Sequence, residues 1–148
     1  MDIFELGKVS LEVLDAFQRL IPQLTKYSPP PTPDALIKMI ESPHTIIFLA
    51  RYPDHGGDIE GTATLAIFQT PTGNHGWIED VVVGQGFRNK GIVKALTEAC
   101  LQKAGEMGLR EVNLSSNPGR AAANKLYQSI GFIRRLTNVY RYPLSEED

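Results

Sequence analysis

The sequence predicts an α/β protein with a mixed, mostly antiparallel central sheet and flanking helices. Apolar residues form short strand-length segments over 45–50, 59–69 and 77–83, separated by turn-forming residues. They recur at helical spacing over 10–21 and 91–107. The inferred order is strand, two helices, three strands, helix, strand, helix and strand, which is typical of an α/β chain with a mixed sheet.

The N-terminal part is expected to hold one strand and two helices. Ile3–Leu6 is the opening strand, and Ser10 is a candidate N-cap for the first helix, in which Pro22 indicates a kink or an end. The prolines of residues 28–33 predict a stiff connector, which serves either as a rigid linker or as a wall of a substrate site. Thr32 then caps a second helix that has proline at its first position.

Turns and glycines set the expected boundaries in the middle of the chain. Asp54–Asp58 and Pro71–Asn74 have turn chemistry and separate the three middle strands, of which the first two form a hairpin. A long helix is expected from Gly91 to about Met107, ending at Gly108. The strand at 112–114 should lie parallel to the strand before this helix, with a right-handed connection.

The C-terminal part is expected to contain a helix over Arg120–Ser129, with Gly131 just past its end. Phe132–Leu144 is expected to be mostly strand, and residues 145–148 to be a solvated tail. No internal repeat or low-complexity segment is visible, so residues 1–148 are expected to form a single domain.

The composition is that of a soluble globular protein and excludes several classes of function. The formal net charge of -2 gives no general attraction to nucleic acid or to an anionic membrane. No apolar run approaches the roughly 20 residues that span a bilayer. The N-terminus lacks the basic region of a signal peptide. A single cysteine, Cys100, cannot form an internal disulfide, and we expect a cytoplasmic protein.

Residues 81–93 run from a strand into the start of the long helix and have the features of an anion-binding loop. A helix N-terminus presents unpaired N–H groups and the positive end of a dipole, which favour a phosphate group. Gly91 removes a side chain where phosphate would approach the backbone. Arg88, Lys90 and Lys94 bring positive charge to the same place.

Three known phosphate-binding loop motifs are alternatives for this segment. A P-loop is excluded because Ile92 and Val93 stand where lysine and a hydroxyl residue are needed. A dinucleotide fingerprint begins at Gly84 but has Asn89 at its third glycine position. The coenzyme A loop, Gln/Arg-x-x-Gly-x-Gly/Ala, is matched by 88–92 up to its last position, which Val93 occupies.

With a second segment, this loop makes the chain resemble the GNAT superfamily of N-acetyltransferases. Val81–Val83 matches the strand that pairs with the pantetheine arm in that family. Ala122–Phe132 matches the family's helix that ends in tyrosine followed by Gly-Phe. The resemblance covers nearly the whole chain in element order and is sharpest from Trp77 to Phe132. It implies the GNAT acyl-CoA N-acyltransferase fold and acetyl-CoA as the co-substrate.

The resemblance implies a cofactor site made by the strand, the loop, the start of the long helix and the following helix. Its residues are Val81, Val82, Val83, Arg88, Asn89, Lys90, Gly91, Ile92, Val93, Lys94, Arg120 and Tyr127. Two of them depart from the family pattern. Val93 narrows the space beside the pyrophosphate but keeps its N–H. Arg120 stands where many relatives have asparagine, and can form a hydrogen bond or a charge contact instead.

Acetyl transfer to an amine needs a deprotonated amine, a donor for the oxyanion and an acid for the leaving thiolate. The resemblance implies Tyr127 as the acid and the N–H of Val82 or of a neighbour as the oxyanion donor. Acidic residues precede the valines, as in glucosamine-phosphate acetyltransferases. Strand alternation points Glu79 and Asp80 to opposite faces, and we favour Glu79 as the base, although Asp80 or an ordered water remains an alternative. Ser115 stands where some relatives carry an acid.

Each of these features also has a structural interpretation, as core strand, solvated loop or amphipathic helix. Their correct order and spacing favour the cofactor site. His44, His55 and His75 share no spacing, so no metal site is expected. Cys100 is expected to be a packed small hydrophobe rather than a nucleophile.

We expect an enzyme that transfers acetyl from acetyl-CoA to a primary amine of a small metabolite or peptide, directly within a ternary complex. The acceptor wall would come from Tyr27–Pro33 and from Asn138, Tyr140 and Tyr142 of the terminal strand. The alternatives are a non-catalytic coenzyme A sensor or interaction module, or an acyltransferase that uses another acyl-CoA. A homodimer is common in the resembling family, but no residue here specifies one.

Overall fold

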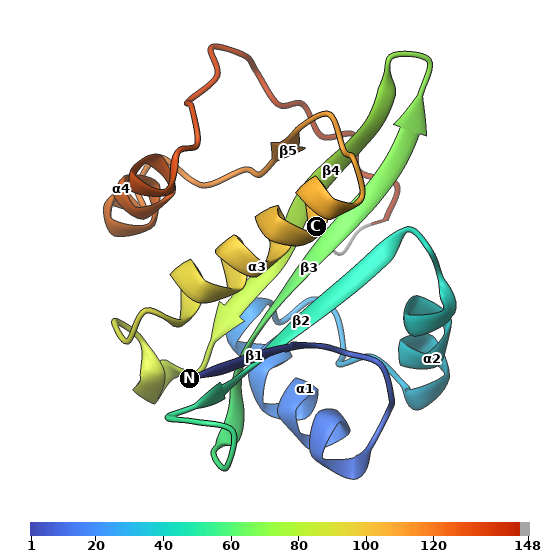
Figure 1. The fold of residues 1–148 in the computed structure, drawn as a ribbon, viewed down its shortest axis with the longest axis vertical. Coiled ribbons are helices and arrows are strands. Elements are labelled where there is room, and N and C mark those ends of the chain that lie inside the picture. Colours follow the sequence, from blue (N-terminus) through green and yellow to red (C-terminus); the bar gives the residue numbers. More distant parts are fainter. Residues whose placement is uncertain (146–148) are drawn as a thin grey trace. The chain divides into compact units, whose positions relative to one another are not determined.

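The computed structural model describes residues 1–145, and these fall into two compact units, of which the second begins at Ser116. Each unit is described separately (Figure 1). The tail expected at 145–148 lies almost entirely outside the described residues. The elements of the first unit are β1 (Asp2–Glu5), α1 (Leu11–Leu24), α2 (Pro33–Glu41), β2 (Thr45–Tyr52), β3 (Asp58–Thr70), β4 (Gly73–Val83), a 3-10 turn (Gln85–Phe87), α3 (Ile92–Glu106) and β5 (Val112–Asn113). The second unit contains α4 (Ala121–Ile130).

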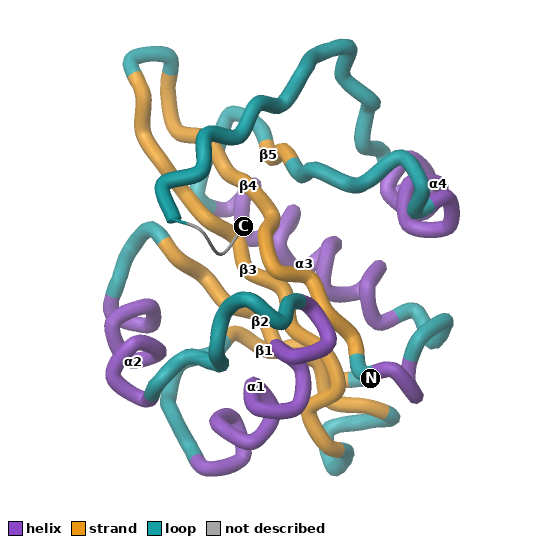
Figure 2. The backbone as a smooth tube through the Cα atoms, turned by 180° about the vertical axis from the view of Figure 1, so that it is seen from behind, coloured by secondary structure: helices purple, strands orange, loops and turns teal. Residues whose placement is uncertain are grey.

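The first unit is built on a five-stranded sheet in the order β1-β2-β3-β4-β5. The first three pairs are antiparallel, and β4 and β5 are parallel. This arrangement confirms the predicted mixed, mostly antiparallel sheet. Helix α3 connects the two parallel strands and lies on one face of the sheet, whereas α1 and α2 lie on the other face (Figures 1 and 2).

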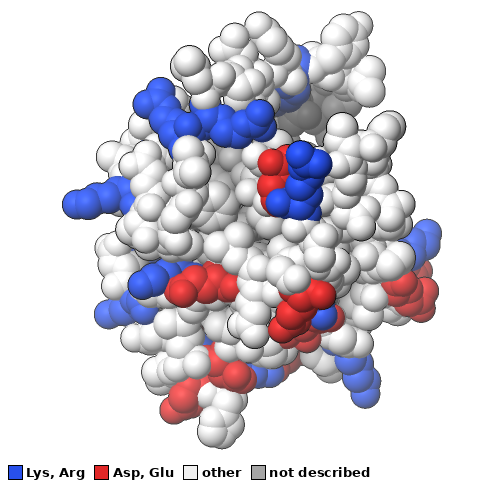
Figure 3. Space-filling view, turned by 45° about the horizontal axis from the view of Figure 1, so that its top comes forward, with Lys and Arg blue, Asp and Glu red and all other residues white. Residues whose placement is uncertain are grey.

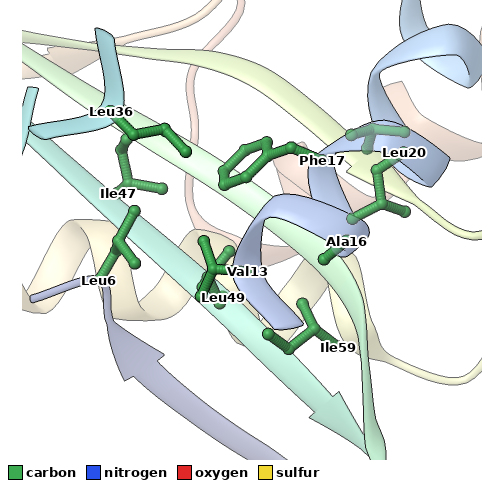
Figure 4. Packing of buried hydrophobic residues seen from close by; sticks show 10 residues of the cluster. Leu6, Val13, Ala16, Phe17, Leu20, Leu36, Ile47, Leu49 and Ile59 are labelled. Carbon is green, nitrogen blue, oxygen red and sulfur yellow. The ribbon is translucent and has the colours of Figure 1, made fainter. Parts of the chain in front are cut away.

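The core between the sheet and α1 is formed by the apolar side chains that recur at regular spacing in both elements. Side chains at alternate positions of β2, Ile47 and Leu49, pack with Val13 and Phe17 of α1 and with Leu36 of α2 (Figure 4). Burying side chains of this size stabilises the fold by roughly 1.5–3 kcal/mol each. This core fixes α1 against the sheet.

The helix starts follow the predicted capping chemistry. The Ser10 hydroxyl accepts the N–H of Val13, and the Thr32 hydroxyl accepts the N–H of Ala35. Helix α1 continues through Pro22 and ends two residues later, at Leu24. The prediction of an end near the proline was therefore close. A proline in the last turn removes one hydrogen bond only, so its cost is local.

Two predictions about the strands were wrong, one about where a strand begins and one about whether a strand forms. Strand β4 begins at Gly73 rather than at Trp77, because Thr70 pairs directly with Gly73 and the turn needs only two residues. No strand forms over residues 132–145, although Phe132–Leu144 was expected to be mostly strand. Residues 133–140 make no backbone hydrogen bond within the described part of the chain. Alternating apolar residues do not form a strand without a neighbour to pair with.

A charged pair joins α1 to the end of β2. The Arg51 guanidinium on β2 donates two hydrogen bonds of 2.6 Å to the Glu12 carboxylate and one of 3.1 Å to the Gly57 carbonyl. The same guanidinium lies 5.2 Å from the centre of the Phe4 ring. The Arg51 hydrogen bond lowers the pKa of Glu12, against the opposing effect of desolvation.

Replacing Glu12 by glutamine should lower the free energy of unfolding at pH 7 by about 0.5–1 kcal/mol, since the pair is bidentate but the carboxylate is half exposed and screened. A lowered pKa in the folded state means that this contribution is present above the unfolded pKa of glutamate, about 4.3. It is lost as the pH falls through the folded pKa. Urea unfolding at pH 7 and at acid pH measures both effects. Glu41→Gln, on the exposed end of α2, is the control. Equal losses in the two variants at pH 7 would contradict the assignment.

Candidate active site

The loop between β4 and α3 is fixed to the sheet where it leaves β4. The N–H of Gly84 donates to the Glu60 carbonyl on β3 at 2.8 Å, and the N–H of Phe87 donates back to the Gly84 carbonyl at 2.8 Å. The Phe87 ring then meets Tyr52 edge to face, with ring centres 5.9 Å apart. These contacts turn the chain out of the sheet towards the start of α3.

Two residues with positive φ connect the β4–α3 loop to the first turn of α3. Asn89 has φ 63° and Gly91 has φ 82°, in the left-handed region that glycine tolerates and asparagine enters more readily than most residues. Gly91 is the N-cap of α3 and has no side chain with which to cap it. Within residues 1–145, the first intrahelical bond is made by the N–H of Ala95, which donates to the Gly91 carbonyl at 3.1 Å.

The first turn of α3 therefore has open N–H groups and nearby cations. The N–H groups of residues 92–94 have no hydrogen-bond acceptor in the described part of the chain. The side chains of Arg88, Lys90 and Lys94 are exposed around this turn. Free N–H groups, the helix dipole and the three cations favour an anion such as a pyrophosphate.

The start of α3 is anchored by a buried side chain over a glycine. Ile92 is 1 % exposed, and a Cβ atom on Gly61 of β3 would lie 2.8 Å from its Cγ2 atom. The helix can approach the sheet this closely because Gly61 has no side chain. Val93, the departure from the family pattern, is half-buried, and its carbonyl accepts the Thr97 hydroxyl at 2.7 Å.

A β-bulge interrupts β4 where the candidate base lies. The pairing with β3 passes from Thr62↔Val82 to Thr64↔Glu79, so Asp80 and Val81 oppose a single residue. Asp80 has φ 52° and leaves the extended conformation. Regular strand alternation is therefore interrupted between Glu79 and Val82, and both carboxylates are exposed. No local sequence signal marks this bulge.

Glu79 has the electrostatic setting of a base. Glu79 is exposed, but protein atoms around it still remove part of its hydration, and this desolvation raises its pKa; the negative charge of Asp80 raises the pKa further. Both effects make the carboxylate a better proton acceptor than an ordinary glutamate. Val82 and Val83 are buried after the bulge, and Val81 is half-buried.

Arg120 and Tyr127 lie in the second unit. Tyr127 is 6 % exposed on α4, and its ring meets Phe132 edge to face at 5.9 Å. Gly131, with φ 125°, turns the chain back so that the N–H of Phe132 donates to the Tyr127 carbonyl at 3.0 Å. Burial raises the pKa of Tyr127, while the charge of Arg120 acts in the opposite direction. The phenol is therefore protonated at neutral pH and can donate a proton.

Cys100 and His75 lie in environments that favour a structural role. Burial raises the pKa of the Cys100 thiol to about 12, which keeps it protonated and unreactive. His75 is buried, and its ring nitrogens lie 2.9 Å from the Thr70 hydroxyl and 3.3 Å from the Glu111 carboxylate. Among residues 1–145, no group of three histidine, cysteine or acidic residues could hold a metal ion.

The tyrosines of the expected acceptor wall are exposed. Tyr27 lies after α1, with the Lys26 ammonium 5.8 Å from its ring centre, and Tyr140 and Tyr142 are exposed in the second unit. A cavity of about 530 Å³ lies elsewhere, between α3 and the strands β1 and β2, and no loop residue lines it.

On the face shown in Figure 3, acidic and basic side chains are interspersed. A bilayer-spanning helix, which must be both long and apolar, is not found in the part of the chain that the structure describes.

Two solved structures share the fold over nearly the whole chain. One is an aminoglycoside acetyltransferase from an uncultured soil metagenomic sample, 21% identical, with a TM-score of 0.82 and coverage of 97% of this chain and 96% of that one. The other is the aminoglycoside N-acetyltransferase AAC(6')-Iy in complex with CoA, 22% identical, with a TM-score of 0.73 and coverage of 96% and 99%. At these identities the likeness establishes the fold alone.

Sequence comparison identifies the family. N-alpha-acetyltransferase 30 of Saccharomyces cerevisiae is 34% identical over 73 residues, which are 49% of this chain. The match spans only 41% of the length of that relative. The sequence model of the Acetyltransferase (GNAT) family matches residues 13–132, which include the loop, the bulged strand and the Tyr127 helix. The chain therefore belongs to the GNAT family of acetyltransferases.

Proposed function

We propose that the chain transfers the acetyl group of acetyl-CoA to a primary amine of a small metabolite or peptide, in a ternary complex. The observation that carries this proposal is the open first turn of α3 behind Gly91, with exposed cations around it. Membership of the GNAT family supports the same activity. We further propose that residues 1–148 act as one acetyltransferase domain in the cytoplasm.

The proposed donor site joins the end of β4 to the start of α3. The N–H groups of residues 92–94 would hold the pyrophosphate, because they have no other acceptor in the described part of the chain. Arg88, Lys90 and Lys94 would add charge contacts, and Asn89 and Gly91 would shape the turn. Val93 would bind the pyrophosphate through its backbone N–H, which is present whatever the side chain at this position.

We propose that the remaining contacts to the cofactor are made by residues of β4 and by Arg120. The bulged strand Val81–Val83 would pair with the pantetheine arm, and Arg120 would meet the cofactor through a hydrogen bond or a charge contact. A bulge leaves its extra residue without a partner in the ladder. The N–H of Val81, at the bulge, or of Val82 is therefore the proposed donor to the thioester oxyanion.

The proposed reaction conserves atoms and charge. The amine nitrogen attacks the thioester carbonyl, forming a C–N bond, and the C–S bond breaks with its electron pair leaving on sulfur. Tyr127 gives its phenolic proton to this thiolate. Glu79, directly or through an ordered water, takes the proton from the amine. The phenol then regains a proton from solvent and Glu79 releases the proton it took, so both groups return to their starting states.

The proposal of an amine acceptor is supported by the acidic residues at the bulge and by the activities of the relatives. Glu79 and Asp80 favour a positively charged amine before it is deprotonated. Tyr27–Pro33, with Asn138, Tyr140 and Tyr142, is the proposed acceptor wall. One relative is an aminoglycoside N-acetyltransferase and another is an N-alpha-acetyltransferase, so aminoglycosides and peptides with a free α-amino group both belong in the first screen. A homodimer stays an expectation drawn from the family.

The activity is tested by thiol release from acetyl-CoA with a panel of aminoglycosides, hexosamines and peptides with free N-termini. We expect the wild-type chain to acetylate at least one class. Tyr127→Phe should slow the reaction about 100-fold, since it removes the acid, while the Kd for coenzyme A changes by less than about twofold. Tight binding of acetyl-CoA without thiol release for any amine would favour a sensor and overturn the proposal. Unchanged turnover in Tyr127→Phe would remove Tyr127 as the acid.

The pH dependence of kcat/KM tests the base. Glu79 must be deprotonated to act, and its pKa is raised, so the rate should fall on the acid side at a higher pH than for an ordinary glutamate. Glu79→Gln should remove this limb and lower the plateau about 100-fold. Asp80→Asn is the matched control at the neighbouring position. A large loss in Asp80→Asn with none in Glu79→Gln would reverse the assignment.

A further inference from the structure

A side chain of α1 reaches the loop that follows β4. The N–H of Gln85 donates to the Gln23 side-chain oxygen at 2.8 Å, across 62 positions of sequence. The amide nitrogen of the same Gln23 side chain donates to the Arg19 carbonyl at 3.0 Å, one turn earlier in α1. Because both ends of the amide are used, its oxygen is held towards the loop.

A second set of contacts, made by Glu60 of β3, holds the start of the same loop at Gly84. Glu60 is the extra residue of a β-bulge in β3, where the pairing passes from Ala50↔Gly61 to Arg51↔Ile59. Its carbonyl accepts the N–H of Gly84, and its nearly buried carboxylate lies 3.5 Å from the Arg19 guanidinium. Arg19 also donates to the Ile59 carbonyl at 3.1 Å. A Cβ atom on Gly84 would lie 2.9 Å from the Glu60 carboxylate, so the chain passes close to this group.

The cations in the middle of the loop, in contrast, are exposed to solvent. The side chains of Arg88, Asn89 and Lys90 are exposed and make no hydrogen bond or ion pair within residues 1–145. At the far end, Ile92 packs over Gly61. The position of the cations ahead of α3 therefore depends on how the two ends of the loop are held.

We propose that Gln23 is a positioning residue for the coenzyme A loop. It fixes the direction in which the chain leaves β4, and through this direction it sets where Arg88 and Lys90 stand relative to the open turn of α3. Gln23 acts through the backbone of Gln85 and does not itself contact the cofactor. This inference rests on the proposed function, because it takes the loop to be the site of coenzyme A.

The test compares three variants of the full chain. Gln23→Met keeps the length of the side chain but has no acceptor for the Gln85 N–H. Gln23→Glu keeps an acceptor oxygen. Gln18→Met makes the same change on the same helix, at an exposed position whose side chain makes no hydrogen bond in the described residues. Three quantities are measured: the Kd for coenzyme A by calorimetry, the hydrogen-exchange rate of the Gln85 amide by NMR, and the Tm.

Loss of one hydrogen bond should raise the Kd of Gln23→Met about 3- to 10-fold and speed exchange of the Gln85 amide by a similar factor. The Tm and the kcat at saturating acetyl-CoA should stay close to wild type, because the contact is at the surface. Gln23→Glu should recover most of the affinity, and Gln18→Met should match wild type.

An unchanged Kd in Gln23→Met would overturn the positioning role, and so would an unchanged exchange rate at Gln85. An equal rise in Kd for Gln18→Met would also overturn it, since it would point to a general effect on α1. If the wild-type chain does not bind coenzyme A, the proposed function fails. The exchange rate of the Gln85 amide still decides in that case whether Gln23 holds the loop.

Discussion

The start of α3 has no side-chain cap, and the organisation of the candidate site depends on this feature. Helices α1 and α2 each begin on a hydroxyl side chain, Ser10 and Thr32 respectively, which accepts an N–H of the first turn. Helix α3 begins instead on Gly91 in the left-handed conformation, so the N–H groups of its first turn remain unpaired within the described residues. Leaving these donors unpaired has a cost that an external anion can offset. An exposed anion-binding turn of this kind needs a rigid support.

The support comes from parts of the chain that are distant in sequence. The buried Ile92 side chain sits over Gly61 of β3, which lets the helix start close to the sheet. Two bulges modify the strands beneath it. One in β3 presents Glu60 to the loop, and one in β4 places Asp80 outside the extended conformation next to Glu79. Regular strands pack the core, and the irregular positions lie where the chemistry is proposed, as is common for bulges near active sites.

Local chemistry determines which parts of this structure can be predicted from sequence. The caps at Ser10 and Thr32, the end of α3 at Gly108 and the mixed sheet all follow from short-range patterns, and the structure confirms them. The bulge at Asp80 could not be predicted, because it depends on the register with β3 and leaves no local pattern. The absence of a strand over 132–145 has a similar origin, since strand formation requires a partner that the alternation of residues does not reveal. The contact between Gln23 and Gln85 joins segments far apart in sequence and carries no signal in either.

The central claim is that the open turn of α3 binds the pyrophosphate of coenzyme A, and NMR titration of the isotope-labelled chain tests it most directly. Coenzyme A should produce its largest amide shifts in residues 89–94, where the N–H groups would gain an acceptor. Pantetheine, which lacks the pyrophosphate, should affect the strand Val81–Val83 and leave 89–94 nearly unchanged. Equal shifts in 89–94 with both ligands, or coenzyme A shifts confined to another part of the chain, would contradict the account.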